Sequence, residues 1–212
     1  MKFRKEMLLL YAVTDRGCVH TGTLCDQVEA ALRGGATLVQ LREKELDEEA
    51  LMREAEELKE LCHRFGVALI INDNVDAALR IGADGVHVGS ADTPVAKIRA
   101  RAPEGFIIGA TAKTVEQARA AQAAGADYIG VGAVFASQTK QQAIRITLQE
   151  LKEICASVSI PAVAIGGIGL DNMAALKGGG MSGIAVVRAL FKAQDIEQAA
   201  RRIRAQAEML VS

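Results

Sequence analysis

A short junction recurs along this chain: a helical segment ends in glycine, and a β-rich apolar segment follows at once. Five examples are RGGATLVQL, RFGVALII, IGADGVHVG, AAGADYIGVG and GGGMSGIAVV. Glycine adopts the left-handed conformation that ends many helices because it has no Cβ to clash. The junctions therefore predict a repeated unit of strand, loop, helix and glycine stop, and about eight such units fit the 212 residues.

The expected strands are short and nearly continuous in apolar residues. They cover residues 8–14, 37–44, 68–73, 85–89, 106–112, 128–135, 161–168 and 183–190. Segments with helical periodicity lie between them, such as 47–66 and 114–125, and a last helix is expected from about residue 195. Apolar strands joined by helices are typical of a parallel sheet covered by helices.

These units predict an α/β fold, a (βα)8 TIM barrel, with residues 1–212 forming a single domain. The alternative is an open, doubly wound sheet. That fold usually carries a GxGxxG loop after its first strand, and the corresponding stretch VTDRGCVHTG does not match. The sequence therefore favours the closed barrel.

Composition excludes several classes of function. The formal net charge is −1 and no basic block stands out, so a nucleic-acid partner is not expected. No apolar run is long enough to span a bilayer, no signal-peptide pattern is present, and the four cysteines form no CxxC pair. We therefore expect a cytoplasmic protein with reduced thiols, small-molecule substrates and no membrane partner; a homo-oligomer is left open.

The stretch VQLREK, residues 39–44, places polar side chains at every second position of an apolar strand. Gln40, Arg42 and Lys44 should share the inner face of a barrel, because alternate strand residues face opposite sides. Interior cations are costly without a partner. An anionic ligand at the barrel mouth explains them, and an internal ion-pair network with carboxylates such as Glu43 or Asp73 is the alternative.

Other predicted strands also end in polar residues, which indicates one site at the mouth. These residues are Asn72, Asp73, Asp92, Thr111, Ser137, Thr139 and Lys140. In barrels the carboxyl ends of the strands build the active site. Asp73 and Asp92 predict an Mg²⁺ site completed by substrate phosphate oxygens, although Asp92 also fits a helix N-cap. Arg42, Lys44 and Lys140 would share the charge of a diphosphate.

The sequence GGIG after the seventh expected strand predicts a second anion site, made of backbone N–H groups. A tight turn is the alternative interpretation. Two anion sites facing each other across one mouth indicate two phosphorylated ligands, or one ligand with phosphates at both ends. No Ser–His–acid set, Cys–His pair or GxSxG elbow is evident.

At this point the motifs match a known family over nearly the whole chain. The matching stretches are YAVTD, GGATLVQLREK, IINDNVDAAL, ADGVHVGSAD, IIGATAKTVEQA, GADYIGVGAVFASQTK, IPAVAIGGIGLDN and GIAVVRAL. The chain resembles thiamine-phosphate synthase, also called thiamine-phosphate pyrophosphorylase. The resemblance implies a (βα)8 transferase that joins a hydroxymethylpyrimidine diphosphate to a thiazole phosphate or its carboxylate. It also implies a carbocation formed as diphosphate leaves.

By position, the resemblance also implies roles for individual residues. Mg²⁺ would be held by Asp73 and Asp92, and Arg42, Lys44 and Lys140 would be the catalytic cations. The pyrimidine diphosphate would contact Gln40, Arg42, Lys44, Asn72 and Thr111, and Glu43 is predicted as a further substrate-binding residue. Ser137, Thr139 and Lys140 would form the family's Thr-x-Thr-Lys element, with Ser in place of the first Thr, and Gly167, Val187 and Arg188 would hold the thiazole phosphate.

Several positions depart from the family pattern. Ser90 stands where the family usually has Gln, Ala133 and Ala136 replace prolines, and Arg188 stands where many members have Ser. The competing functions are the paralogous thiazole tautomerase and a non-catalytic binder of thiazole or thiamine phosphate. The tautomerase uses a histidine near the end of the fifth strand, where this chain has Lys113. Intact QLREK and NDN motifs favour the synthase.

Overall fold

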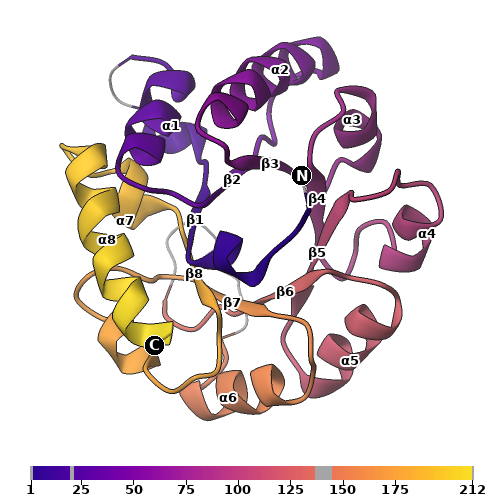
Figure 1. Ribbon diagram of the computed structural model, residues 1–212, viewed down its shortest axis with the longest axis vertical. Helices are drawn as coiled ribbons and strands as arrows, with labels where there is room; N and C mark the ends of the chain where they lie inside the picture. Colours follow the sequence, from indigo (N-terminus) through magenta and orange to yellow (C-terminus); the bar gives the residue numbers. More distant parts are fainter. Residues whose placement is uncertain (1, 20–21, 137–144, 212) are drawn as a thin grey trace.

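The computed structural model describes residues 2–19, 22–136 and 145–211, and eight parallel strands among them close into a barrel (Figure 1). The strands are β1 Leu10–Val13, β2 Leu38–Leu41, β3 Ala68–Asn72, β4 Gly85–Val88, β5 Ile107–Ala112, β6 Tyr128–Val131, β7 Ala162–Ile165 and β8 Gly183–Val186. Each strand pairs with the next, and β8 pairs with β1. The predicted (βα)8 barrel is confirmed.

Helices form the outer ring that Figure 1 shows around the strands. The α-helices are α1 Leu24–Arg33, α2 Glu48–Arg64, α3 Val75–Arg80, α4 Val95–Arg99, α5 Val115–Ala123, α6 Leu148–Ala156, α7 Arg188–Phe191 and α8 Ile196–Val211. The 3-10 helices are η1 Lys5–Leu8, η2 Arg16–Cys18 and η3 Met173–Leu176. No helix in the described ranges is both long and apolar enough to cross a membrane.

The glycine stops behave as the sequence predicts. Gly35, Gly66, Gly82 and Gly125 follow α1, α2, α3 and α5 with φ of 97°, 69°, 59° and 94°. Residues with a Cβ rarely adopt this left-handed region, so glycine is the residue that ends each helix and turns the chain into the next strand. The repeated junction therefore marks where a helix ends and the next strand begins.

Two layers of apolar side chains hold the barrel together. One layer lies between strands and helices, and it includes Val39 and Leu41 of β2. The other fills the barrel interior and includes Leu38 of the same strand. The N-terminal segment crosses the barrel opening in Figure 1, and the ring of Phe3 stacks on that of Tyr128 with centroids 5.7 Å apart. The interior is thus closed at the N-terminal end of the strands.

Every strand is shorter than predicted, and two of these differences change the description of the site. The strand β2 ends at Leu41, so Arg42 to Lys44 belong to the loop that follows it. The segment expected as a strand to residue 190 changes into the short helix α7 at Arg188. A continuous apolar run does not distinguish a buried strand from a buried helix segment, which is why the second boundary was wrong.

Candidate active site

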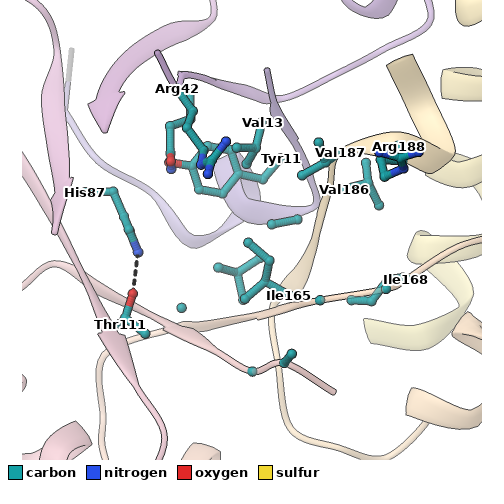
Figure 2. Close-up of a pocket in the computed structure, with 18 of the residues that line it drawn as sticks. Tyr11, Val13, Arg42, His87, Thr111, Ile165, Ile168, Val186, Val187 and Arg188 are labelled. Atoms are coloured by element: carbon teal, nitrogen blue, oxygen red, sulfur yellow. Dashed lines mark hydrogen bonds between the residues drawn. The ribbon is translucent and has the colours of Figure 1, made fainter. Parts of the chain in front are cut away.

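A cavity of about 480 Å³ opens at the carboxyl ends of the strands, the end of a TIM barrel where active sites lie. Its size falls in the range of small-molecule sites. Ten of the predicted site residues line it, and Figure 2 shows part of the lining. They are Gln40, Arg42, Lys44, Asn72, Asp73, Asp92, Thr111, Gly167, Val187 and Arg188.

The cationic part of the lining follows β2. The backbone N–H of Arg42 donates to the hydroxyl of Thr14 at 2.9 Å, and the N–H of Thr14 donates to the carbonyl of Gln40, also at 2.9 Å. These bonds tie the ends of β1 and β2 together just beyond the strands. The side chain of Arg42 lines the cavity together with Tyr11 (Figure 2), where its guanidinium can meet an anion.

The acidic part of the lining follows β3 and β4, which pair through Asn72 and His87. Asp73 has a φ of 60°, which a non-glycine residue rarely adopts. Its backbone N–H donates to the carbonyl of His87 at 2.9 Å, and its carboxylate accepts from the Asn72 amide at 2.7 Å. Strain of this kind is concentrated at functional sites, and here it turns the Asp73 side chain toward the cavity.

Asp92 reaches the same cavity from the loop after β4. Its carboxylate accepts from the backbone N–H of Gly89 at 2.7 Å. It is not an N-cap, because α4 begins after Pro94, which has no side-chain cap bond. The N-cap alternative for Asp92 is therefore excluded, and the residue lies instead at the edge of the cavity.

Asp73 and Asp92 are the carboxylates that could hold a metal here. The described residues contain no group of three or more His, Cys, Asp or Glu side chains placed to hold a metal ion. Two carboxylates at a cavity rim still suit Mg²⁺, which keeps waters and accepts phosphate oxygens to complete six ligands. The donor set fits a metal that enters with a phosphorylated substrate.

Glu43 lies elsewhere: the described residues that line the cavity do not include it. Its carboxylate accepts from Nε of Arg16 at 3.0 Å, while the NH2 group of Arg16 pairs with Glu54 of α2 at 2.7 Å. Only 3% of the Glu43 side chain is exposed, its Oε1 has no hydrogen-bond partner, and burial raises the pKa of this carboxyl. Glu43 therefore points away from the cavity that Arg42 and Lys44 line, and its ion pair with Arg16 supports the loop on the other side.

The opposite side of the cavity is formed by the loop after β7 and the end of β8. Gly167 has a φ of 64°, and a Cβ there would fall on the carbonyl of Ala136. Asn172 closes this loop, because its Nδ2 donates to the carbonyl of Gly167 at 2.8 Å and its Oδ1 accepts from Gly169 N–H at 3.0 Å. Arg188 lies beside the loop in the lining. The glycine loop that the sequence predicts to bind an anion therefore lies on this side of the cavity.

Ser137, Thr139 and Lys140 lie outside the described residues, so their predicted roles stay predictions. The lining also contains residues that the sequence interpretation missed, namely Tyr11, Val13, His87, Ile165, Asp171 and Asn172. The alternation of inward-facing and outward-facing residues along each strand could have identified some of them. Tyr11 and Val13 share one face of β1, as Gln40 does in β2, and His87 lies on the inner face of β4.

Polar groups extend from the cavity into the barrel interior. His87 bonds through Nδ1 to the hydroxyl of Tyr128 and through Nε2 to that of Thr111, both at 3.1 Å. The Tyr128 hydroxyl bonds to that of Tyr11 at 2.9 Å, and Gln40 Nε2 donates to the Tyr11 hydroxyl at 2.6 Å. Burial raises the pKa of both phenols. The two phenol groups in the interior therefore stay protonated below the charged residues at the cavity mouth.

The fold places this cavity at the end of the barrel where TIM-barrel enzymes carry their active sites. Comparison with known proteins gives the family: residues 10–190 match the family model described as thiamine monophosphate synthase. The chain belongs to that family, and the predicted resemblance and enzyme class are confirmed.

Individual relatives agree along almost the whole chain. The chain is 46% identical to a thiamine-phosphate synthase of Ruminiclostridium cellulolyticum, over 92% of each protein. It is 41% identical to one of Clostridium botulinum, over 95% of this chain and 94% of that protein. Among solved structures, thiamine phosphate pyrophosphorylase from Pyrococcus furiosus superimposes with a TM-score of 0.89 at 36% identity, covering 98% of this chain and 99% of that one.

Proposed function

We propose that this chain is a thiamine-phosphate synthase that joins a hydroxymethylpyrimidine diphosphate to a thiazole phosphate, releasing diphosphate. One observation carries the proposal. A single cavity has cations and two carboxylates on one side and a glycine-lined loop with Arg188 on the other. This arrangement suits two ligands that face each other across the cavity. One is a diphosphate, which leaves during the reaction, and the other is a monophosphate, which is only bound. A carboxylated thiazole would react in the same way with loss of CO2.

The cationic side would act on the bond that breaks. As the C–O bond to the diphosphate lengthens, negative charge grows on the departing oxygens and positive charge grows on the pyrimidine methylene carbon. Arg42 and Lys44 line the cavity where they would meet the departing oxygens, and charge stabilisation that grows in the transition state lowers the barrier. Bound Mg²⁺, held by Asp73 and Asp92, would supply further charge neutralisation on the diphosphate.

The middle of the cavity is apolar, and this suits a carbocation. Val13, Ile165 and Val187 line the wall between the two rims (Figure 2). Water in contact with the cation would convert it to the alcohol, so a wall that excludes water favours attack by the thiazole nitrogen. The aminopyrimidine ring delocalises the positive charge. No protein nucleophile is required, since the carbon–nitrogen bond forms directly between the two substrates.

The glycine side would hold the thiazole phosphate by backbone amides. Gly167 lets an anion approach the main chain closely, and Arg188 can add a charged donor at the same place. Because the phosphate keeps its charge throughout the reaction, this side mainly binds and orients. By the family resemblance, Ser137, Thr139 and Lys140 would also take part, and they lie outside the described residues.

The test is a reconstitution with purified protein, Mg²⁺, the pyrimidine diphosphate and the thiazole phosphate. We expect thiamine phosphate and diphosphate to form in equal amounts. The same mixture without either substrate is the control. If no product forms and the thiazole carboxylate is instead tautomerised, the function is that of the paralogue, whereas saturable binding without any turnover would identify a passive binder.

A further inference from the structure

Five polar side chains form one continuous hydrogen-bonded chain across the barrel interior. It runs from Gln40 on β2 through Tyr11 and Tyr128 to His87 on β4 and Thr111 on β5. The four bonds measure 2.6, 2.9, 3.1 and 3.1 Å between donor and acceptor atoms in that order. Both ends line the substrate cavity, so the chain connects two parts of the site that are far apart in the sequence.

Either hydroxyl could be the donor in the Tyr11–Tyr128 bond, and the bond from Gln40 favours Tyr11. Nε2 of Gln40 donates to the Tyr11 hydroxyl oxygen, and the Tyr128 oxygen is then the acceptor that this chain offers to the Tyr11 hydrogen. The hydroxyl of Tyr128 then donates to Nδ1 of His87. An imidazole that accepts at Nδ1 carries its hydrogen on Nε2. Nε2 therefore donates to Oγ1 of Thr111, and the hydroxyl hydrogen of Thr111 is left to point elsewhere.

We propose that His87 is a positioning residue whose Nε2–H tautomer, fixed by this chain, holds the Thr111 hydroxyl as a hydrogen-bond donor toward the substrate diphosphate. The inference rests on the proposed function, because that function puts a diphosphate in the cavity. His87 acts through Thr111 and need not touch the reacting atoms. In the reverse direction Thr111 would donate to His87 and offer the anion only lone pairs, which repel it.

The packing around His87 is built for this orientation. Gly109 and Gly130 lie beside the imidazole, and a Cβ added to them would lie 2.5 Å from Nδ1 and 3.0 Å from Cε1 of His87. Only residues without side chains leave this space. The phenols of Tyr11 and Tyr128 stay protonated because burial raises the pKa of each. Both tyrosine hydroxyls therefore keep the hydrogens that the chain requires.

The energetic consequence lies in the transition state. A hydroxyl already turned toward the cavity needs no reorientation when charge grows on the departing diphosphate. Loss of one hydrogen bond of this kind should lower the rate about tenfold, which corresponds to about 1.4 kcal/mol. Loss of the orientation should therefore lower kcat and leave the KM values nearly unchanged.

The first experiment reads the tautomer directly and needs no change at the site. The protein has three histidines, so a His20→Gln, His63→Gln variant leaves His87 as the remaining imidazole. Nitrogen-15 NMR of that ring distinguishes a protonated Nε2 from a protonated Nδ1. We expect the Nε2–H form, and Tyr128→Phe should allow both forms to appear. A ring protonated at Nδ1 alone would overturn the proposal.

The second experiment is a double-mutant cycle between His87 and Thr111. Asn in place of His87 is too short to reach Thr111, and Val in place of Thr111 removes the hydroxyl. We expect His87→Asn to lower kcat about tenfold in the wild-type background and less than about twofold in the Thr111→Val background. Losses that multiply would show that His87 acts independently of Thr111 and would contradict the proposal.

Matched variants separate positioning from general disruption. Thr111→Ser keeps the hydroxyl and should preserve the dependence on His87. In His87→Gln an amide nitrogen can take the place of Nε2, so this variant should recover part of the kcat lost in His87→Asn. Thiamine phosphate formation by the unmodified protein checks the proposed function separately. A productive enzyme with the wrong tautomer refutes only the role of His87, whereas absence of product refutes the proposed function.

Discussion

The two sides of the barrel mouth handle anions by different means. On the β2–β4 side, side chains carry full charges: Arg42 and Lys44 face the cavity together with Asp73 and Asp92. On the β7–β8 side, the proposed anion site is a loop that contains Gly167, and Arg188 lines the cavity on the same side. Full charges are suited to a group whose charge grows during reaction, and backbone amides are suited to a group whose charge stays constant.

The same difference explains how each side is supported. The charged side depends on strained or buried polar groups, such as Asp73 with its positive φ and Glu43 paired behind the loop with Arg16. The glycine side depends on closure by one side chain, Asn172, which bonds to Gly167 and Gly169. If the two sides have these different roles, substitutions on the β2–β4 side should act mainly on kcat. Substitutions on the β7–β8 side should act mainly on the KM of the thiazole phosphate.

The largest effect is expected at the metal carboxylates. Asp73→Ala should lower kcat by about a thousandfold or more, because loss of a bound divalent cation removes several kcal/mol of charge stabilisation. EDTA should abolish activity of the unmodified protein, and excess Mg²⁺ should restore it. Diphosphate release is the measurement. Asp76→Ala, on the exposed face of α3, is the control. Normal turnover without metal would remove Asp73 and Asp92 from the proposed site.

The next effect tests the cations. Arg42→Leu should lower kcat by roughly a hundredfold, the scale on which one charge-stabilising donor contributes in a transition state. Arg53→Leu removes the same charge from an exposed position of α2 and should leave kcat unchanged. Steady-state kinetics with both substrates would show the split. An unchanged kcat in Arg42→Leu would mean that this arginine serves only the structure of the loop.

A smaller effect tests the glycine side. Gly167→Ala should raise the KM of the thiazole phosphate by about tenfold with little change in kcat, because the Cβ strains the backbone and falls on the Ala136 carbonyl. Gly66→Ala is a matched control, since its φ is 69° and nothing lies within 4 Å of the added Cβ. It should lower stability alone. An equal rise in the KM of the pyrimidine diphosphate would contradict the division between the two sides.

The sequence predicted the barrel well because its signals are local and repeated. Gly35, Gly66, Gly82 and Gly125 each stop a helix for the same steric reason, and each occurrence supports the others. Boundaries were less predictable. The apolar run through Arg188 fits both a strand and a helix, and only tertiary packing decides between them.

The site was predictable where alternation alone places a side chain. Gln40 is on the inner face of β2 and lines the cavity, as the period of two requires. Glu43, in the loop after β2, pairs with Arg16 instead of lining the cavity, although it was predicted among the substrate-binding residues. The chain through Tyr11, Tyr128 and His87 was not predictable, because its members come from three strands and meet only when the barrel closes.

The smallest effect concerns the support behind the charged side. Burial raises the pKa of Glu43 above its ordinary value of 4.5, so the folded state binds a proton more tightly than the unfolded state does. The stability from this group is fully present below the unfolded pKa and is lost as pH rises through the folded pKa. Relative to Glu43→Gln, the unmodified protein should therefore become less stable as pH rises from about 4 to about 7.

Urea unfolding of both proteins at a series of pH values measures this difference, and Glu49→Gln, at an exposed position of α2, is the control that should show none of it. A difference that grows with pH would show that the Arg16 pair only partly compensates the buried carboxylate, so the charged side is held at a cost in stability. A difference independent of pH would mean that Glu43 is as well solvated in the folded protein as in the unfolded chain. The contrast between a strained, charged side and a relaxed, glycine-lined side would then rest on Asp73 alone.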